Sequence, residues 1–240
     1  MQINVSPDQS YIHELRVGFK KFRALIRLLR NKKKVKKRLY VPEKLKSMYK
    51  RAGALRDKQL YYDFINSHFD ENSKPVLSDD VSGEITARKK IMQRYIHSFP
   101  FKKLESAIEI NLPKKLTKKS MQKYFNDQKD RCIEIIHEPD SDEKFHGVRK
   151  CLKDIVNNAT ALKKILTHNS VMNKKDKLTH LEDIIGEYND LRIVLSFLNE
   201  DIHTYTTLEP ALKLIQKKCY ANKKTLRQKI QKQLNEFSWS

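Results

Sequence analysis

Apolar residues recur along most of the chain at intervals of three and four, which is the spacing of an amphipathic helix. The first such segment opens at Ser6-Pro7, a capping residue followed by a proline that suits the first helical position, and extends to about Arg30. Its apolar positions are Ile12, Leu15, Phe19, Phe22, Ile26 and Leu29. We expect these residues to face a helical core, and the pattern as a whole predicts an all-α fold.

The same periodicity predicts further helices over 42–69, 83–98, 117–137, 141–167, 173–199 and 208–237. Residues 31–38 carry mostly Lys and Arg and are predicted to form a solvated connector. Residues 71–82 contain Asn, Ser and Pro and are predicted to form a loop. The segment 102–115 is ambiguous because Pro113 interrupts it.

The chain matches itself without a gap when it is shifted by 133 positions (146 − 13 = 133). Residues 13–66 align with 146–199 and give ten identities among 54 pairs, where chance would give roughly three or four at average residue frequencies. We therefore expect one domain over 1–240 that is built from two similar helical bundles, about 6–112 and 116–238. A pseudo-twofold axis would relate the two bundles.

A row of basic residues flanks the apolar positions of the first helix, one residue further along. One residue is about 100° of helix rotation, so this row lies beside the buried face. It consists of His13, Arg16, Lys20, Arg23, Arg27 and Arg30. The row at the 133 offset begins with His146, Arg149 and Lys153, has Lys150 nearby, and weakens at Val156 and Thr160. Cations in line repel one another, so this acid-free pattern favours a polyanion ligand over a merely solvated face.

The composition agrees with a polyanionic partner. Lys and Arg number 50 and Asp and Glu 29, so the formal charge is +21 (50 − 29), and a polyanion would relieve the resulting self-repulsion. Nucleic acid, a phosphate polymer and an anionic membrane surface are the candidates. No signal peptide is evident, and no apolar run approaches the ~20 residues of a membrane span. Three cysteines without a CxxC pattern favour a reduced cytoplasm.

The histidines and aspartates that match at the 133 offset each have two interpretations. His13 and His146 are either structural or are cations that touch phosphate, more strongly near or below pH ~6.5. Asp57 and Asp190 each follow a glycine by four residues, which suggests an ion pair that orients an Arg or His of the same half. A catalytic or metal-binding role is the alternative. Gly53 and Gly186 lie within segments of helical pattern, where Gly costs about 1 kcal/mol relative to Ala. We therefore expect close helix packing at both glycines.

Motifs for other chemistry are missing. HExxH, GxxxxGK[ST] and GxGxxG do not occur, and the cysteines and histidines show no zinc spacing. The basic row contains no aromatic residue, whereas single-strand nucleic-acid binders stack bases on aromatics. We therefore expect no cofactor, no metal and no catalytic residue. Two rival functions stay open: a nucleic-acid-binding basic helical protein, and a metal-dependent phosphatase that uses Asp57 and Asp190.

Four segments, 13–24, 52–57, 146–153 and 185–191, together resemble the CHAD domain (conserved histidine α-helical domain). They carry His-Glu-Leu-Arg, Gly-Ala-Leu-Arg-Asp, His-Gly-Val-Arg and Gly-Glu-Tyr-Asn-Asp. The resemblance implies two bundles and polyphosphate bound in a central basic groove. Members often accompany a triphosphate-tunnel domain with an ExExK signature; none occurs here, so we expect a standalone binder. Val156 and Thr160 stand where the first copy has Arg23 and Arg27, so we expect unequal contributions from the halves.

We therefore predict a non-enzymatic, cytoplasmic module that binds inorganic polyphosphate, with polyphosphate granules as a candidate location and nonspecific nucleic-acid binding beside it. The predicted phosphate-binding residues are His13, Arg16, Lys20, Arg23, Arg27, Lys90, Arg94, His146, Arg149, Lys150, Lys153, Lys223 and Arg227. Among these, Lys90 and Arg94 recur at the 133 offset as Lys223 and Arg227 and form a second tier. The predicted orienting residues are Asp57 and Asp190.

Overall fold

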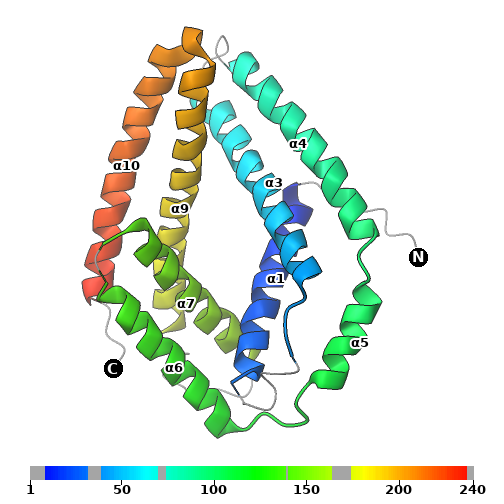
Figure 1. The fold of residues 1–240 in the computed structure, drawn as a ribbon. Coiled ribbons are helices and arrows are strands. Elements are labelled where there is room, and N and C mark those ends of the chain that lie inside the picture. Colours follow the sequence, from blue (N-terminus) through cyan, green and yellow to red (C-terminus); the bar gives the residue numbers. More distant parts are fainter. Residues whose placement is uncertain (1–8, 32–38, 70–73, 139, 164–173, 237–240) are drawn as a thin grey trace. The chain divides into compact units, whose positions relative to one another are not determined.

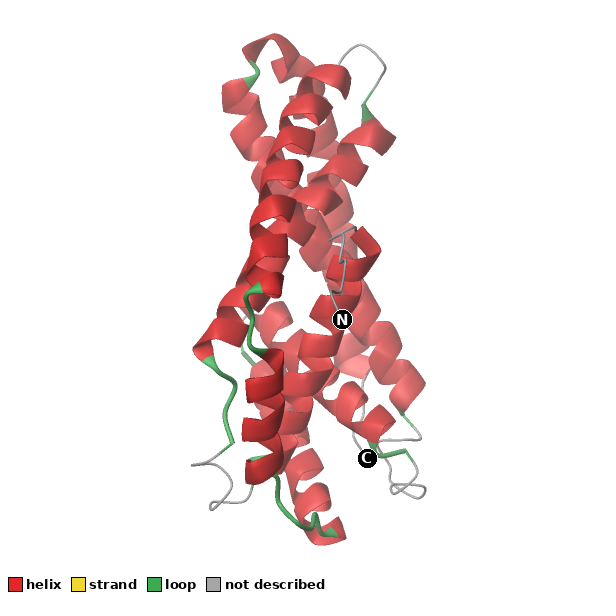
Figure 2. Ribbon diagram, turned by 90° about the vertical axis from the view of Figure 1, so that its right-hand side faces the viewer, coloured by secondary structure: helices red, strands yellow, loops and turns green. Residues whose placement is uncertain are grey.

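The computed structural model describes residues 9–31, 39–69, 74–138, 140–163 and 174–236. Every regular element in these ranges is a helix, which confirms the predicted all-α fold (Figures 1 and 2). The elements are α1 (Gln9–Leu29), α3 (Glu43–His68), α4 (Lys74–His97), α5 (Phe101–Asn111), α6 (Lys118–Ile136), α7 (Asp142–Ala161), α9 (Lys175–Thr204), the 3-10 helix η1 (Thr206–Leu208) and α10 (Glu209–Glu236).

Capping residues account for two of the predicted helix starts. The Thr117 side chain accepts a hydrogen bond from the Ser120 amide at the start of α6, and Ser141 does the same for the Lys144 amide at the start of α7. The ambiguous segment forms α5, which ends at Asn111. Leu112 is already extended, as expected for a residue that precedes a proline.

The predicted loop over 71–82 is wrong for 74–82, because α4 begins at Lys74. Leu77, Val81 and Ile85 follow one another at intervals of four and are all buried. Their burial stabilises a helix through a segment whose composition suggested a turn. Pro75 falls in the first helical turn, where its missing N–H removes no intrahelical hydrogen bond.

Other predicted boundaries shift by a few residues. Helix α9 continues to Thr204 rather than ending at 199, and Ile202 in the added turn is buried. Helix α7 ends at Ala161 rather than 167. The predicted start at Ser6-Pro7, most of the connector 31–38, the helix start at 173 and the helix end at 237 lie outside the described residues.

The chain divides into two compact units. Unit 1 comprises Met1–Arg16, Ser47–Ser98 and Glu187–Gln231; unit 2 comprises Val17–Lys46, Phe99–Gly186 and Lys232–Ser240. Each unit takes residues from both halves of the sequence repeat, so the boundary between units is not the predicted boundary near 112–116. That each half forms its own bundle stays a prediction, as does the pseudo-twofold axis.

The core of unit 1 includes an aromatic cluster between α3 and α9. The Tyr61 ring lies 5.0 Å from the ring centroid of Phe197 and 6.4 Å from that of Phe64. Its hydroxyl donates a hydrogen bond to Asp201, and burial together with this bond raises the pKa of Tyr61. Lys58 Nζ lies 4.3 Å from the Phe197 ring centroid, so a cation lies over one ring of the cluster.

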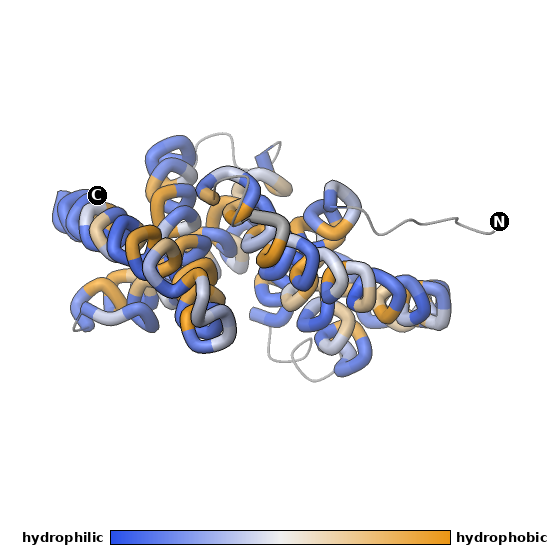
Figure 3. The backbone as a smooth tube through the Cα atoms, turned by 90° about the horizontal axis from the view of Figure 1, so that it is seen from above, coloured by the Kyte–Doolittle hydropathy of each residue, from blue (hydrophilic) through white to orange (hydrophobic). Residues whose placement is uncertain are grey.

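The core of unit 2 is centred on α7, whose predicted apolar positions are buried. These are Phe145, Val148, Leu152, Ile155 and Ala159. Asn158 joins three helices: its Nδ2 donates to the Ala24 carbonyl on α1 at 2.9 Å and to the Tyr124 hydroxyl on α6 at 3.0 Å. Apolar and polar positions alternate along the helices, as the amphipathic pattern predicts (Figure 3).

Matching residues of the sequence repeat fall in corresponding helices. Arg16 and Arg149 lie on α1 and α7, Gly53 and Gly186 lie on α3 and α9, and α3 and α9 begin 132 residues apart (175 − 43). Residues that match in the alignment therefore occupy comparable places in comparable helices. This correspondence allows the environments of Arg16 and Arg149 to be compared directly.

Candidate functional site

In unit 1, Arg16 of α1 lies against Gly53 of α3. Its Nη1 is 2.5 Å from the position that a Cβ atom would take at Gly53, so a larger residue there would have to displace the guanidinium. The guanidinium carbon also lies 5.0 Å from the ring centroid of Tyr49, one helical turn before the glycine. The prediction of close helix packing at Gly53 is corrected accordingly, because an arginine side chain fills the space.

Asp57, one turn after Gly53, shares the electrostatic environment of Arg16. Burial raises the pKa of the Asp57 carboxyl; the charge of Arg16 opposes this shift and the charge of Asp190 adds to it. Arg56 and Arg192 also favour the ionised carboxylate. Two aspartates from matching repeat positions thus interact within unit 1 among three arginines. Their role in orienting Arg16 stays a prediction.

In unit 2, Arg149 of α7 takes the matching place against Gly186 of α9. Its Nη2 is 3.3 Å from the Cβ position at Gly186, a less tight approach than in unit 1. Here the residue one turn before the glycine is Glu182, whose Oε1 lies 3.4 Å from Arg149 Nη2 and 2.6 Å from Lys153 Nζ. The Glu182 side chain is only 10% exposed. Two predicted phosphate ligands therefore share an internal carboxylate.

Arg27 also has an internal partner. Its Nη1 donates to both carboxylate oxygens of Asp154, on α7 in the same unit. Burial raises the pKa of Asp154, and the neighbouring Arg27 opposes that shift. Because an unpaired buried charge is costly, this pair ties the C-terminal half of α1 to α7. The geometry favours a structural role for Arg27. The contact of Arg27 with phosphate stays a prediction.

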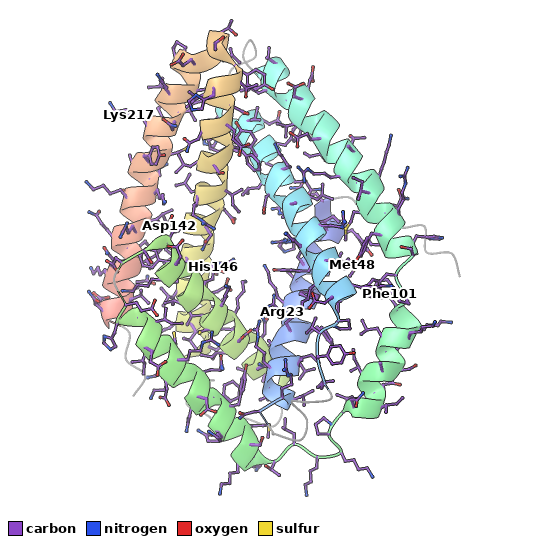
Figure 4. The ribbon with its side chains drawn as sticks, in the orientation of Figure 1. Arg23, Met48, Phe101, Asp142, His146 and Lys217 are labelled. Carbon is purple, nitrogen blue, oxygen red and sulfur yellow. The ribbon has the colours of Figure 1, made fainter. Side chains whose placement is uncertain are left out.

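The remaining predicted cations differ in exposure. The exposed ones are His13, Lys90, Arg94, His146 and Lys150, and the half-buried ones are Lys20, Arg23, Lys223 and Arg227. Arg23 lies over the Phe19 ring at 5.7 Å, and Lys223 Nζ is 5.2 Å from the ring centroid of Tyr188. Unit 2 contains both Arg23 on α1 and His146 on α7 (Figure 4).

Unit membership separates the predicted residues further. Unit 1 contains His13, Arg16, Asp57, Lys90, Arg94, Asp190, Lys223 and Arg227, and unit 2 contains Lys20, Arg23, Arg27, His146, Arg149, Lys150 and Lys153. The basic row of α1 is therefore shared, with its first two members in unit 1 and the others in unit 2.

Two acids that pair with predicted ligands, Asp154 and Glu182, were not predicted from the sequence. Both were visible in the repeat alignment as changes of side-chain charge. Asp154 stands where the first copy has Lys21, and Glu182 stands where it has Tyr49. Comparing the residues around the basic row, as well as the row itself, would have found both.

Two further properties bear on the range of functions. Within the described ranges, no group of three or more His, Cys, Asp and Glu side chains is arranged to hold a metal ion. None of the described helices has the length and apolar character needed to cross a membrane.

The model of the CHAD domain family matches residues 4–199, which is 196 of the 240 residues (199 − 4 + 1). The chain belongs to the CHAD domain family. The CHAD match includes both Arg–Gly pairs and ends before α10, so Lys223 and Arg227 lie beyond it.

The crystal structure of the CHAD domain from the plant Ricinus communis has a similar fold. The two superpose with a TM-score of 0.76 and 15% sequence identity, over 96% of this chain and 83% of the plant CHAD domain. At that identity the likeness supports the fold alone. No curated protein sequence matches the chain.

Proposed function

We propose that this CHAD domain binds inorganic polyphosphate, or a similar linear phosphate polyanion, without catalysing a reaction. The environment of Arg16 is the observation that most supports this function. The guanidinium lies over the Tyr49 ring and in the space above Gly53. A guanidinium that lies over an aromatic ring can still donate N–H groups to phosphate oxygens.

The row on α1 provides further cations for a linear ligand. Lys20 and Arg23 follow Arg16, and residues seven apart on a helix are separated by about 10.5 Å along its axis. Successive phosphates of a flexible chain can therefore meet successive side chains. His13 is exposed and precedes Arg16 by three residues on α1, which supports the prediction that it contacts phosphate.

A titration with long-chain polyphosphate at low salt tests this function. We expect the affinity to fall as the salt concentration rises. A plot of log affinity against log salt should have a slope near −4 if about six phosphates are neutralised. Arg16→Ala with Arg23→Ala should weaken binding, whereas Lys217→Ala with Lys218→Ala removes the same charge from exposed positions of α10 and should change it little. Equal losses in the two variants would indicate attraction to net charge alone.

The rival functions give opposite results. RNA of equal charge should displace polyphosphate weakly; equal displacement would favour a nucleic-acid-binding protein. The wild type should release no phosphate from polyphosphate with added Mg²⁺ or Mn²⁺. Metal-dependent release that disappears in Asp57→Asn would favour a phosphatase.

The three cysteines are unpaired, which supports a cytoplasmic location, and polyphosphate granules are the compartment we propose.

A further inference from the structure

The two Arg–Gly pairs differ at the residue one turn before the glycine. Tyr49 precedes Gly53 and Glu182 precedes Gly186, at matching positions of the repeat (182 − 49 = 133). In unit 1 this position places an aromatic ring beside Arg16. In unit 2 it places a carboxylate beside Arg149.

Glu182 contacts the cations as a bound anion would. Its Oε1 is 2.6 Å from Lys153 Nζ and 3.4 Å from Arg149 Nη2, and its side chain is 10% exposed while those of the two cations are 23–25% exposed. Arg149 and Lys153 are four residues apart on α7, so without an anion they would repel each other. A phosphate oxygen would need these same donors.

We propose that Glu182 is an internal counter-ion that competes with phosphate for Arg149 and Lys153. A ligand must displace this carboxylate before it can use the pair, so Glu182 lowers the affinity of the unit 2 cations. This inference rests on the proposed function and adds a residue that regulates it. Phosphate chains therefore engage the Arg149–Lys153 pair only at higher ligand concentration than they would without Glu182.

The comparison of Glu182→Gln with Asp183→Asn tests this role. Both changes remove one negative charge from adjacent positions of α9, but Asp183 is exposed whereas Glu182 is buried. In polyphosphate titrations we expect Glu182→Gln to bind about threefold to tenfold more tightly than wild type, and Asp183→Asn less than about twofold more tightly. Equal affinities of the two variants would overturn the inference while leaving polyphosphate binding intact.

A second measurement does not depend on polyphosphate binding. Thermal unfolding is followed with increasing sodium pyrophosphate, and with sodium chloride of equal ionic strength as the reference. If Glu182 occupies an anion site, pyrophosphate should raise the Tm of Glu182→Gln more than that of Asp183→Asn or wild type. An equal rise in the three proteins would overturn the inference. A selective rise without polyphosphate binding by any of them would support it and refute the proposed function.

Discussion

Two Arg–Gly pairs share one backbone arrangement, Arg16 with Gly53 and Arg149 with Gly186. The two guanidinium groups nevertheless lie in different electrostatic environments. In both, a glycine on one helix makes room for an arginine from another. The first arginine lies over an aromatic ring, whereas the second shares a carboxylate with Lys153. The comparison shows that matching cations in a repeat need not be equally available to a ligand.

The difference has a simple physical origin. An aromatic ring interacts with the face of a guanidinium and does not use its N–H groups. A carboxylate accepts hydrogen bonds from those same groups and neutralises the charge. Exchange of Tyr for Glu at one position is therefore enough to alter the second pair, even though the arginine and the glycine are both kept.

The largest expected effect separates the two arginines directly. Arg16→Ala with Arg23→Ala should weaken polyphosphate binding by about tenfold or more, because hydrogen bonds to charged groups contribute roughly 1.5–3 kcal/mol each. Arg149→Ala with Lys153→Ala should weaken it by only about threefold, since Glu182 already offsets one of the two positive charges of that pair. Isothermal titration at low salt measures both losses.

The control for this comparison repeats the second double substitution in the Glu182→Gln background, where no buried carboxylate is left unpaired. Far-ultraviolet circular dichroism should show that all variants remain helical. Equal losses of affinity in the two double variants would show that the partners of the arginines do not matter.

Tyr49→Glu should convert the first pair into a copy of the second. A carboxylate beside Arg16 would compete with phosphate, and we expect about a fivefold loss of affinity in the same titration. Tyr49→Gln is the matched control, because it removes the ring without adding a charge. A loss of the same size in Tyr49→Gln would attribute the effect to the ring.

Gly53→Ala should lower the affinity for polyphosphate without lowering the stability of the protein. The new Cβ would lie 2.5 Å from the present position of Arg16 Nη1, so the guanidinium must move, and we expect affinity to fall about threefold. Replacing Gly by Ala within a helix also stabilises it by up to about 1 kcal/mol, so the free energy of unfolding should stay the same or rise. Urea denaturation and titration of one sample measure both quantities.

Gly186→Ala is the matched variant in unit 2. The Arg149 contact there is 3.3 Å, so a displacement of a few tenths of an ångström suffices and binding should change less. A greater loss of affinity in Gly186→Ala than in Gly53→Ala would reverse the order that we assign to the two pairs.

The smallest expected effect concerns the pH dependence of stability. The pKa of Asp57 is raised in the folded state, mainly by burial, so the folded protein binds its proton more tightly than the unfolded chain does. Wild-type stability should therefore rise, relative to Asp57→Asn, as the pH falls from neutral toward the ordinary pKa of 3.8. Urea denaturation across this range measures the difference, with Asp79→Asn as an exposed control on α4. A relative fall on acidification would show that the charge of Arg16 outweighs the effect of burial.

The sequence was sufficient for the helices and for the apolar core of α7, because both depend on periodicity along a single segment. It failed at 74–82, where turn-forming composition concealed the buried positions Leu77, Val81 and Ile85. Local propensity contributes little to a helix in comparison with the burial of an apolar face. Only the packing of unit 1 shows that these three residues form the buried face of α4.

The row of cations on α1, its partial copy on α7 and the net charge follow from the amino-acid sequence alone, because each is a property of residue type and spacing. The partner of each cation was decided by tertiary structure. Arg27 meets Asp154 across 127 positions of sequence, and Lys153 meets Glu182 from a different helix. Coulomb energy depends on distance in space and on burial. For that reason a row that is continuous in sequence divides, once folded, into arginines that lie over a ring and arginines that pair with a carboxylate.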